Sequence, residues 1–194
     1  MKKLYGEKEQ KEYVSGGEWE AKWICHPEAS AEESALYCFR LSFDLPEDTV
    51  IRVSVSADQR YIFYADGVKQ GEGPERGDFD NWFFETYELA LGKGPHAFSV
   101  LNWFIRYEDR PPVAQMFWRP GFILECRELP GLDTGSGLWK ALKVPGFSID
   151  EPNRETYTGS RFAIHGALVP WGFLAGEAGN WKEPRVLWKG SNKY

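Results

Sequence analysis

The densest run of polar side chains lies at residues 71–82, Gly-Glu-Gly-Pro-Glu-Arg-Gly-Asp-Phe-Asp-Asn-Trp. A carbohydrate site needs a flat aromatic ring against the apolar C–H edges of a sugar, and planar hydrogen-bonding side chains for its hydroxyls. This run supplies both types, and further tryptophans with polar neighbours follow along the chain. The sequence therefore predicts a set of candidate carbohydrate-binding residues: Arg76, Asp78, Asn81, Trp82, Asn102, Trp103, Gln115, Trp118 and Arg119.

Tryptophan has a second and commoner use, because large aromatic side chains fill hydrophobic cores. For any single candidate tryptophan, this core role is the favoured interpretation. Four other tryptophans lie beside strand-like segments and are predicted to serve in packing: Trp19, Trp23, Trp139 and Trp171.

Asp78 and Asp80 could also supply oxygen ligands to Ca²⁺. The sequence lacks, however, the glycine and the distal glutamate of the helix-loop-helix calcium motif. Capping of turns through side-chain to backbone hydrogen bonds is the favoured role of both aspartates. No cofactor is therefore predicted, and Ca²⁺ held by Asp78 and Asp80 remains the alternative.

Recognised signatures of catalysis are missing from the sequence. It contains no Gly-x-Ser-x-Gly nucleophile elbow and no His-Glu-x-x-His zinc motif. Glycoside hydrolysis needs two carboxylates about 5 to 9.5 Å apart, a condition that some pair among 29 acidic residues meets by accident. His26, His96 and His165 have turn-like or apolar neighbours, typical of surface or core histidines. We predict no catalytic residue in this chain.

The charge and the terminal sequence argue against several classes of partner and location. The net charge is −6, so neither nucleic acid nor an anionic membrane is expected to bind. The longest apolar stretch, residues 97–105, is far shorter than a membrane helix, which needs about 20 residues. The N-terminus lacks the apolar segment of a signal peptide, and the three cysteines show no Cys-x-x-Cys spacing. A cytoplasmic protein with reduced cysteines is expected.

Short strands are expected to position the candidate residues. Twenty glycines and 12 prolines divide the chain into pieces too short for long helices. Asp66-Gly67 between two apolar runs predicts a hairpin, because both central residues of such a turn need positive φ. Apolar and polar residues alternate with period two around Val53 and Val55, as in a strand with one buried face. The predicted strands are 36–43, 50–57, 61–64, 84–89, 97–104 and 121–127, followed by less regular ones at 138–144, 147–149, 161–164 and 186–188.

Short strands at this spacing predict an all-β sandwich or barrel. Residues 1–14, rich in Lys and Glu, are expected to form an N-terminal tail. Residues 15–190 are expected to form a single β-sandwich domain, with 130–190 completing the same sandwich. Two long connections, 72–83 and 104–121, are candidates for function, because long ordered loops often carry it.

Several motifs follow one another in the order found in a known family. They include Trp-Glu-Ala-Lys-Trp-Ile at 19–24, Phe-Arg-Leu-Ser-Phe at 39–43, Ser-Ala-Asp-Gln-Arg-Tyr at 56–61, Tyr-Ala-Asp-Gly at 64–67 and Gly-Pro-Glu-Arg-Gly-Asp at 73–78. Trp82, Tyr87, Gly-Lys-Gly at 92–94, Ala-Gln-Met at 114–116 and Arg-Pro-Gly at 119–121 come after them. With these motifs, residues 19–127 resemble the N-terminal region of bacterial α-L-rhamnosidases of glycoside hydrolase family 78. Trp171-Gly172 and Trp181 match that family more loosely.

The resemblance implies a jelly-roll β-sandwich of the galactose-binding-domain type, which precedes a catalytic helical barrel in those enzymes. The acid and base carboxylates of that family belong to the barrel, so no catalytic residue is carried over to this chain. A helical barrel does not fit into 194 residues with this glycine and proline content. The hairpin has Asp66-Gly67 where relatives tend to have Asn-Gly, and either pair suits the turn.

The expected function is that of a non-catalytic accessory domain of an α-L-rhamnosidase-like glycoside hydrolase. Its partner would be the catalytic helical barrel of the same protein, and residues 72–82 and 106–119 would contact a rhamnose-containing glycan. The alternative is an independent, lectin-like carbohydrate-binding module.

Overall fold

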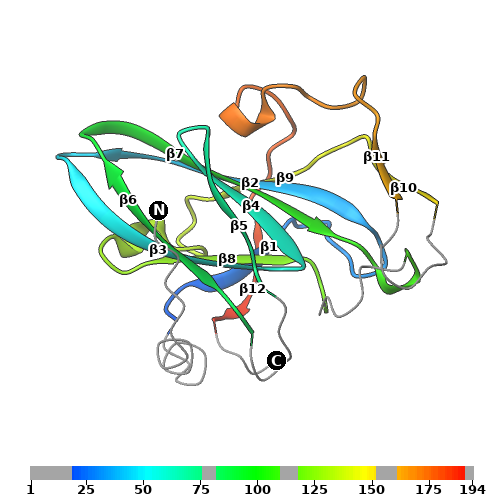
Figure 1. Cartoon of the computed structure of the whole chain (residues 1–194), viewed down its shortest axis with the longest axis horizontal. Helices are drawn as coiled ribbons and strands as arrows, with labels where there is room; N and C mark the ends of the chain where they lie inside the picture. The colour runs from blue at the N-terminus through cyan, green and yellow to red at the C-terminus, as the bar shows by residue number, and fades with distance from the viewer. Residues whose placement is uncertain (1–18, 76–81, 110–117, 152–160, 191–194) are drawn as a thin grey trace.

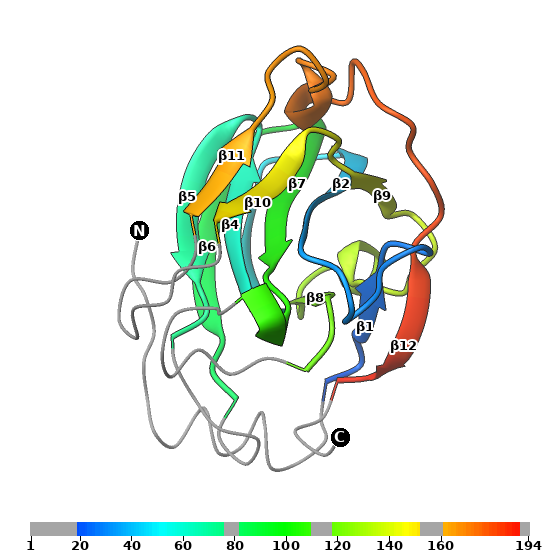
Figure 2. The ribbon, with the colours of Figure 1, turned by 90° about the vertical axis from the view of Figure 1, so that its right-hand side faces the viewer.

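Two antiparallel sheets of five strands each face one another and form a β-sandwich (Figure 1, Figure 2). The computed structural model of the chain describes residues 19–75, 82–109, 118–151 and 161–190. The only helices in these ranges are single 3₁₀ turns. The prediction of an all-β jelly-roll β-sandwich is therefore confirmed.

The first sheet has the strand order β12-β1-β8-β3-β6. It joins the two ends of the described chain, because β1 lies between β12 and β8. Its strands are β1 (Lys22–Cys25), β3 (Thr49–Asp58), β6 (Glu85–Leu91), β8 (Gly121–Cys126) and β12 (Arg185–Lys189).

The second sheet has the strand order β5-β4-β7-β2-β9. Its strands are β2 (Ala35–Leu45), β4 (Arg60–Ala65), β5 (Val68–Gly73), β7 (Gly94–Phe104) and β9 (Lys140–Lys143). A separate ribbon pairs β10 (Phe147–Glu151) with β11 (Arg161–Ile164). The 3₁₀ turns are η1 (Tyr107–Asp109), η2 (Pro130–Leu132) and η3 (Phe173–Ala175).

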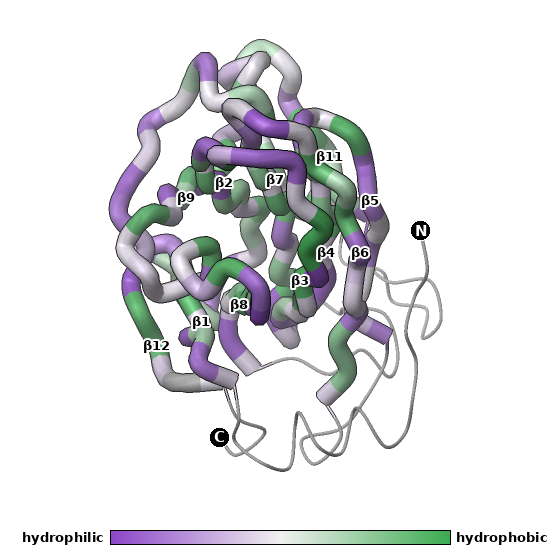
Figure 3. The backbone as a smooth tube through the Cα atoms, turned by 90° about the vertical axis from the view of Figure 1, so that its left-hand side faces the viewer, coloured by the Kyte–Doolittle hydropathy of each residue, from purple (hydrophilic) through white to green (hydrophobic). Residues whose placement is uncertain are grey.

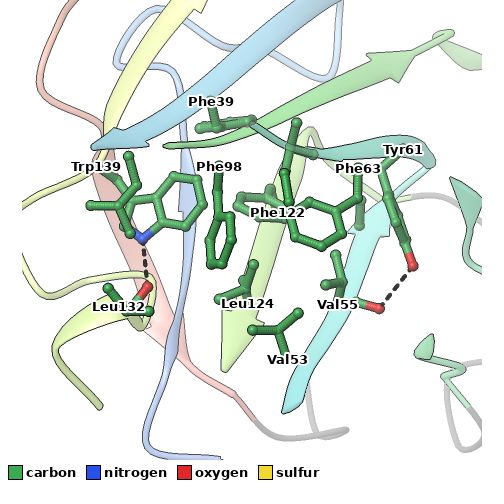
Figure 4. Close-up of a cluster of buried hydrophobic side chains, with 14 of the residues drawn as sticks. Phe39, Val53, Val55, Tyr61, Phe63, Phe98, Phe122, Leu124, Leu132 and Trp139 are labelled. Carbon is green, nitrogen blue, oxygen red and sulfur yellow. Dashed lines mark hydrogen bonds between the residues drawn. The ribbon is translucent and has the colours of Figure 1, made fainter. Parts of the chain in front are cut away.

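Side chains from the inner faces of both sheets meet in one core (Figure 4). In β2, alternate residues such as Tyr37, Phe39 and Leu41 are buried there, as the two-residue period of a strand requires. Phe39 stacks across the core on Phe122 of β8, with ring centroids 5.2 Å apart. Figure 3 shows hydrophobic stretches along core-lining strands such as β4 and β7. The period-two pattern thus determines which face of each sheet is buried.

The hairpin between β4 and β5 confirms the turn predicted from Asp66-Gly67. Asp66 has φ 49° and Gly67 has φ 76°, so both central residues adopt the left-handed conformation. The Asp66 carboxylate also accepts the backbone N–H of Ala97 at 2.8 Å, which ties the turn to β7.

The six strands predicted between residues 36 and 127 are present, with ends shifted by a few residues. Two strands have no counterpart among the predictions. β1 has only four residues, and β5 reads Val-Lys-Gln-Gly-Glu-Gly, with one apolar side chain. β5 forms because the turn at Asp66 and the ladder with β4 hold it at the sheet edge, and neither cause is visible as a hydrophobic period.

Three of the four tryptophans assigned to packing are buried, as predicted: Trp19, Trp23 and Trp139. Trp139 also donates its indole N–H to the Leu132 carbonyl at 2.9 Å (Figure 4). The prediction is wrong for Trp171, whose side chain is 70% exposed. Trp171 lies in the turn between β11 and η3, outside both sheets, where its indole donates to the Gly166 carbonyl.

The three cysteines lie in different strands, with buried and free thiols: Cys25, Cys38 and Cys126. In the described part of the chain, no helix is long and apolar enough to cross a lipid bilayer.

Residues 166–181, called the covering segment below, lie on the outer face of the second sheet. Phe173 of this segment is buried in a cluster with Leu142 of β9. The hydroxyl of Ser99 in β7 donates to the Leu174 carbonyl at 2.8 Å. The second sheet is therefore covered on both faces over β2, β7 and β9, by the core and by this segment.

Candidate functional site

An aromatic cluster covers part of the outer face of the first sheet. Trp23 of β1 belongs to it, whereas the next residue, Ile24, points into the core. Trp82 meets Trp23 edge to face, with ring centroids 5.8 Å apart. Trp188 of β12 pairs with Trp23 in the ladder, and their rings lie 6.5 Å apart. The cluster is completed by Trp19, Ala21, Phe84, Ile123 and Leu187.

Trp82 is an interior member of this cluster, with only 9% of its surface exposed. Its indole N–H donates to the Ser56 hydroxyl at 3.0 Å, and that hydroxyl donates to the Phe83 carbonyl at 2.8 Å. These bonds fix the ring and satisfy its polar atom. Trp82 therefore offers little ring surface to a ligand.

Trp118 and Arg119 extend the cluster to accessible side chains. Trp118 is 39% exposed and stacks on Trp188, with ring centroids 5.9 Å apart and planes inclined by 30°. The guanidinium carbon of Arg119 lies 4.6 Å from the Trp118 ring centroid and 5.3 Å from that of Trp188. These are cation–π distances. We call Trp118, Arg119 and Trp188 the Trp118 shelf. It joins an aromatic surface to a positive charge.

Asp58, the last residue of β3, holds the Trp118 shelf in place. Its Oδ2 accepts the backbone N–H of Trp118 at 2.6 Å and that of Arg119 at 2.9 Å. Burial raises the pKa of Asp58 to about 7, although these two hydrogen bonds and the charge of Arg119 act in the opposite direction. One buried carboxyl group thus orients both residues that carry the accessible chemistry.

Asn102 and Gln59 fix the backbone around Asp58 from the interior. The Asn102 amide donates to the carbonyls of Asp58 at 3.1 Å and Arg60 at 3.0 Å. The Gln59 amide binds both backbone groups of Ile105, at 2.5 Å to its oxygen and 3.1 Å to its nitrogen. Asn102 is fully buried, so its side chain serves the backbone rather than a surface site.

Trp103 lies on the other side of the sandwich from the Trp118 shelf. In β7 it pairs with Leu36 of β2. Leu36 and Leu101 belong to the cluster on the outer face of the second sheet, and alternation along β7 places Trp103 on that same face. The candidate residues that the structure describes are thus divided between the two sheets, and among them Trp118 and Arg119 form a common accessible surface.

Five predicted binding residues or metal ligands lie outside the described residues: Arg76, Asp78, Asp80, Asn81 and Gln115. Within the described ranges, no group of three or more His, Cys, Asp and Glu side chains is placed to hold a metal ion. The Ca²⁺ alternative, which depends on Asp78 and Asp80, stays a prediction.

Glu85 of β6 forms a buried polar cluster with two tyrosines between the sheets. The Tyr61 hydroxyl lies 2.5 Å from Glu85 Oε2 and 2.9 Å from the Tyr87 hydroxyl. Burial, followed by the charge of Glu85, raises the pKa of Tyr61 well above its ordinary value. Glu85 Oε1 accepts the backbone N–H of Glu75 at 3.2 Å, and the absence of a side chain at Gly73 leaves room for the carboxylate. The cluster therefore fixes the chain where it leaves β5.

Two further buried carboxylates also bind backbone N–H groups. Glu125 Oε2 accepts from Glu20 at 2.7 Å and from Ala21 at 3.2 Å. Asp133 Oδ1 accepts from Cys126 at 2.8 Å. Each buried carboxylate in the described ranges is thus hydrogen-bonded to backbone within the fold: Asp58, Glu85, Glu125 and Asp133.

Sequence reasoning did not identify Asp58 or Trp188 as parts of this site. Asp58 lies within a quoted motif, yet a carboxylate that binds backbone elsewhere in the chain has no local signature. Trp188 comes from a strand far along the chain from Trp118. Knowledge that β12 pairs with β1 would have shown that Trp188 neighbours Trp23 on the outer face.

Comparison with known proteins gives matches only among solved structures: no protein-family model and no curated protein matches the chain. The family 78 rhamnosidase of Bacillus sp. GL1 is 20% identical, with a TM-score of 0.73 over 88% of this chain and 18% of that chain. The α-L-rhamnosidase of Dictyoglumus thermophilum is 16% identical, with a TM-score of 0.63 over 91% of this chain and 22% of that chain. The enzyme of Aspergillus terreus is also 16% identical, with a TM-score of 0.62 over 90% and 22%.

The resemblance to α-L-rhamnosidases is thus confirmed at the level of the fold. The chain spans 18% to 22% of the length of these three proteins, so the likeness concerns a domain-sized part of each.

Proposed function

We propose that the chain is a non-catalytic accessory domain of a larger α-L-rhamnosidase-like glycoside hydrolase, in which it docks on a catalytic helical-barrel domain. The observation that carries the proposal is that 88% of this chain matches only 18% of the Bacillus enzyme. The buried carboxylates support the non-catalytic part, because each is hydrogen-bonded to backbone within the fold.

An exposed apolar surface on and after β11 offers a place for docking. Phe162 stacks on Phe147 of the neighbouring strand β10, with centroids 5.8 Å apart, yet remains exposed. Phe162 and Ile164 lie on one face of β11, Leu168 and Trp171 follow within seven residues, and exposed apolar side chains are typical of protein interfaces. We call this surface the β11 patch: Phe162, Ile164, Leu168 and Trp171.

Binding of this chain to a separately expressed catalytic domain tests the docking proposal. The gene is expected to encode such a domain beside this one. A Leu168→Ser, Trp171→Ala double variant should bind at least about ten-fold more weakly, because exposed aromatic anchors often dominate interfaces. Val50→Ala, at an exposed apolar position in β3, is the matched control and should leave the affinity unchanged.

Two results would contradict the proposal. One is the absence of a complex, or a complex that the β11 patch variant does not weaken. The other is turnover of an aryl α-L-rhamnoside by this chain alone, which would place catalytic groups within it.

A second candidate function, carbohydrate binding, is favoured by the Trp118 shelf. A partly exposed indole beside a cation offers a surface for the C–H face of a sugar and donors for its oxygens. Titration calorimetry with L-rhamnose should give a saturable heat that disappears in Trp118→Ala. Trp171→Ala, which removes an exposed tryptophan elsewhere, should retain the heat. The absence of any saturable heat at millimolar sugar would contradict rhamnose binding.

A further inference from the structure

His96, near the start of β7, has a hydrogen-bond acceptor at each of its two ring nitrogens. Its Nδ1 lies 2.7 Å from Asp66 Oδ2, and its Nε2 lies 2.6 Å from the carbonyl oxygen of Gly92. A carbonyl oxygen and an ionised carboxylate only accept hydrogen bonds, whereas a neutral imidazole carries a single N–H. Both contacts are therefore hydrogen bonds only when the ring carries two N–H groups, that is, as an imidazolium cation.

The two acceptors are held in place by hydrogen bonds that do not involve the His96 ring. The Asp66 backbone N–H donates to the Ala97 carbonyl at 2.8 Å, and the Ala97 N–H donates to Asp66 Oδ1 at 2.8 Å. In the turn between β6 and β7, the Lys93 N–H donates to Asp48 Oδ1 at 2.8 Å. The acceptors on both sides of the ring thus belong to turns that are fixed by their own contacts.

The surroundings of the ring favour its positive charge. The hydrogen bond to Asp66, followed by that to the Gly92 carbonyl, raises the pKa of His96 above its ordinary value, and burial acts in the opposite direction. The charges of Asp66 and Asp44 also raise it. The charged residues at the end of β2 and in the three adjoining turns are acidic except for one lysine: Asp44, Glu47, Asp48, Asp66 and Lys93.

The contacts of His96 join two turns of different kinds. Asp66 belongs to the hairpin between β4 and β5, which are both strands of the second sheet. Gly92 belongs to the turn through which the chain passes from β6 in the first sheet to β7 in the second. Phe43 of β2 pairs with His96 in the ladder and packs on its ring, with centroids 5.7 Å apart. His96 therefore links the hairpin to a connection between the two sheets.

We propose that His96 is a pH-sensitive clasp, which holds the β6–β7 turn to the β4–β5 hairpin as an imidazolium and releases the turn when it loses a proton. The proton leaves Nε2 for the solvent, because the Nδ1–H stays bound to the Asp66 carboxylate. The Nε2 lone pair then faces the Gly92 carbonyl oxygen, and that hydrogen bond is lost. Because the pKa of His96 is raised in the folded state, the clasp contributes its full stability below about pH 6.5. This contribution is lost as the pH rises through the pKa of His96 in the folded protein.

Nuclear magnetic resonance of the whole chain with ¹⁵N-labelled histidine tests the proposal, because the ring nitrogen shifts distinguish the imidazolium from each neutral tautomer. The His96 ring should titrate at a higher pH than an ordinary histidine. Above its pKa it should become the Nδ1–H tautomer, the form that keeps the hydrogen bond to Asp66. Burial lowers the pKa of His26, so the signals of that ring titrate at lower pH.

Amide hydrogen exchange shows whether the turn follows the ring. After correction for the intrinsic effect of pH, protection of the Lys93 N–H should fall about three- to ten-fold as His96 loses its proton, as for the loss of one hydrogen bond. The Ala141 N–H, which donates to the Lys182 carbonyl in another part of the fold, is the control and should keep its protection.

Asp66→Asn removes the carboxylate but keeps the turn, because Asn also suits the left-handed conformation of this residue. The Asn amide can donate to Nδ1 of a neutral ring, which then keeps its Nε2–H for the Gly92 carbonyl. His96 of this variant should therefore titrate at a lower pH than in the wild type, change to the Nε2–H tautomer, and keep Lys93 protected above its pKa. Asp44→Asn is the matched control, since it removes a charge that makes no hydrogen bond to the ring, and it should lower the pKa of His96 less than Asp66→Asn does.

Two results on the wild type alone would overturn the clasp. One is a His96 ring that titrates no higher than an ordinary histidine, or that becomes the Nε2–H tautomer when neutral. The other is Lys93 protection that does not change as His96 titrates, which would show that the ring does not hold the turn. Titration of His96 at the same pH in Asp66→Asn and the wild type would assign the protonation to another group and overturn the proposal as well.

Discussion

On the outer face of the second sheet the covering segment buries Phe173 over Leu142, whereas on the outer face of the first sheet Trp118 stays 39% exposed. Both faces carry large apolar side chains. The covered face is held by apolar contacts and by a backbone carbonyl that accepts from Ser99. The accessible face ends in an indole and a guanidinium that one buried carboxyl group, Asp58, holds through two backbone N–H groups.

This difference separates stability from availability for binding. A face closed by the chain's own residues contributes burial and loses its surface to partners. A face anchored by an ionisable group at one point keeps its side chains accessible, but its stability depends on the state of that group. The two faces should therefore respond to different perturbations.

The largest expected effect is a pH dependence that belongs to the accessible face. The pKa of Asp58 is raised from 3.8 to about 7, so the native state binds more protons than the unfolded state between those values. The contribution of Asp58 to stability is therefore greatest below about pH 4 and falls by up to about 4 kcal/mol as the pH rises to about 7. Denaturant titrations across this range should show a steeper fall of stability in the wild type than in Asp58→Asn.

Asp133 also makes stability depend on pH in this range, so its contribution must be separated from that of Asp58. Burial raises its pKa to about 6, so it changes stability in the same direction, but it binds backbone away from the Trp118 shelf. The difference between the wild-type and Asp58→Asn curves isolates Asp58. A variant with the same slope as the wild type would show that Asp58 does not titrate between folded and unfolded states.

The next largest effect belongs to the covered face. Phe173→Ala removes a buried ring between the covering segment and the second sheet, and should lower the free energy of unfolding by about 3 kcal/mol. The loss should be independent of pH, because no ionisable group takes part in that cluster at neutral pH. Carbohydrate binding at the Trp118 shelf should be unchanged in this variant. Loss of binding there would show that the two faces are coupled.

A smaller effect is expected from adding a side chain at Gly190, whose backbone lies close to the aromatic cluster. A Cβ atom at Gly190 would lie 2.5 Å from Cβ of Trp19 and 2.7 Å from Cδ1 of Ile123. Gly190→Ala should therefore lower the free energy of unfolding by about 2 kcal/mol through overpacking. Gly131→Ala, where nothing lies within 4 Å, is the matched control and should be nearly neutral. Equal stability of the two variants would contradict tight packing on this face.

The smallest expected effect on stability comes from the shelf itself. Trp118→Ala should change the free energy of unfolding by less than about 1 kcal/mol, because its ring is partly exposed. Trp82→Ala in the same cluster should cost about 3 kcal/mol, since that ring is buried and hydrogen-bonded to Ser56. Chemical denaturation of both variants measures the contrast. Equal losses would mean that Trp118 serves in packing rather than in binding.

Much of the fold could be predicted because its signals are local. The alternation at Val53 and Val55 and the turn at Asp66-Gly67 require only neighbouring residues, and β3 and the turn after β4 follow from them. β5 was missed because its pairing, not its composition, makes it a strand. The exposure of Trp171 was not predicted, because residue type and neighbours along the chain do not show that this segment lies in a turn outside both sheets.

The candidate site was harder to predict than the fold, for a related reason. Residue type selected Trp118 and Arg119, but the same types selected the buried Trp82 and Asn102. What separates them is long-range contact: Trp188 arrives from β12, and Asp58 reaches the Trp118 shelf from the end of β3. Neither contact follows from spacing along the chain, because both depend on how the strands are ordered in the first sheet.

The pairing of β1 with β12 has a mechanical consequence. Lys22 faces Lys189 at the end of the ladder, and the Gly190 N–H donates to the Ala21 carbonyl at 2.9 Å, so the two chain directions leave the sandwich side by side. A force that pulls apart the chain segments flanking β1 and β12 would break the hydrogen bonds of the ladder one at a time, rather than loading all of them together in shear. Once the contacts of Glu20 and Ala21 with Glu125 are broken, this ladder is the first strand pairing that such a force would open. Its opening would carry Trp188 away from Trp118, so that mechanical load on the flanking chain would dismantle the shelf before it disturbs the core.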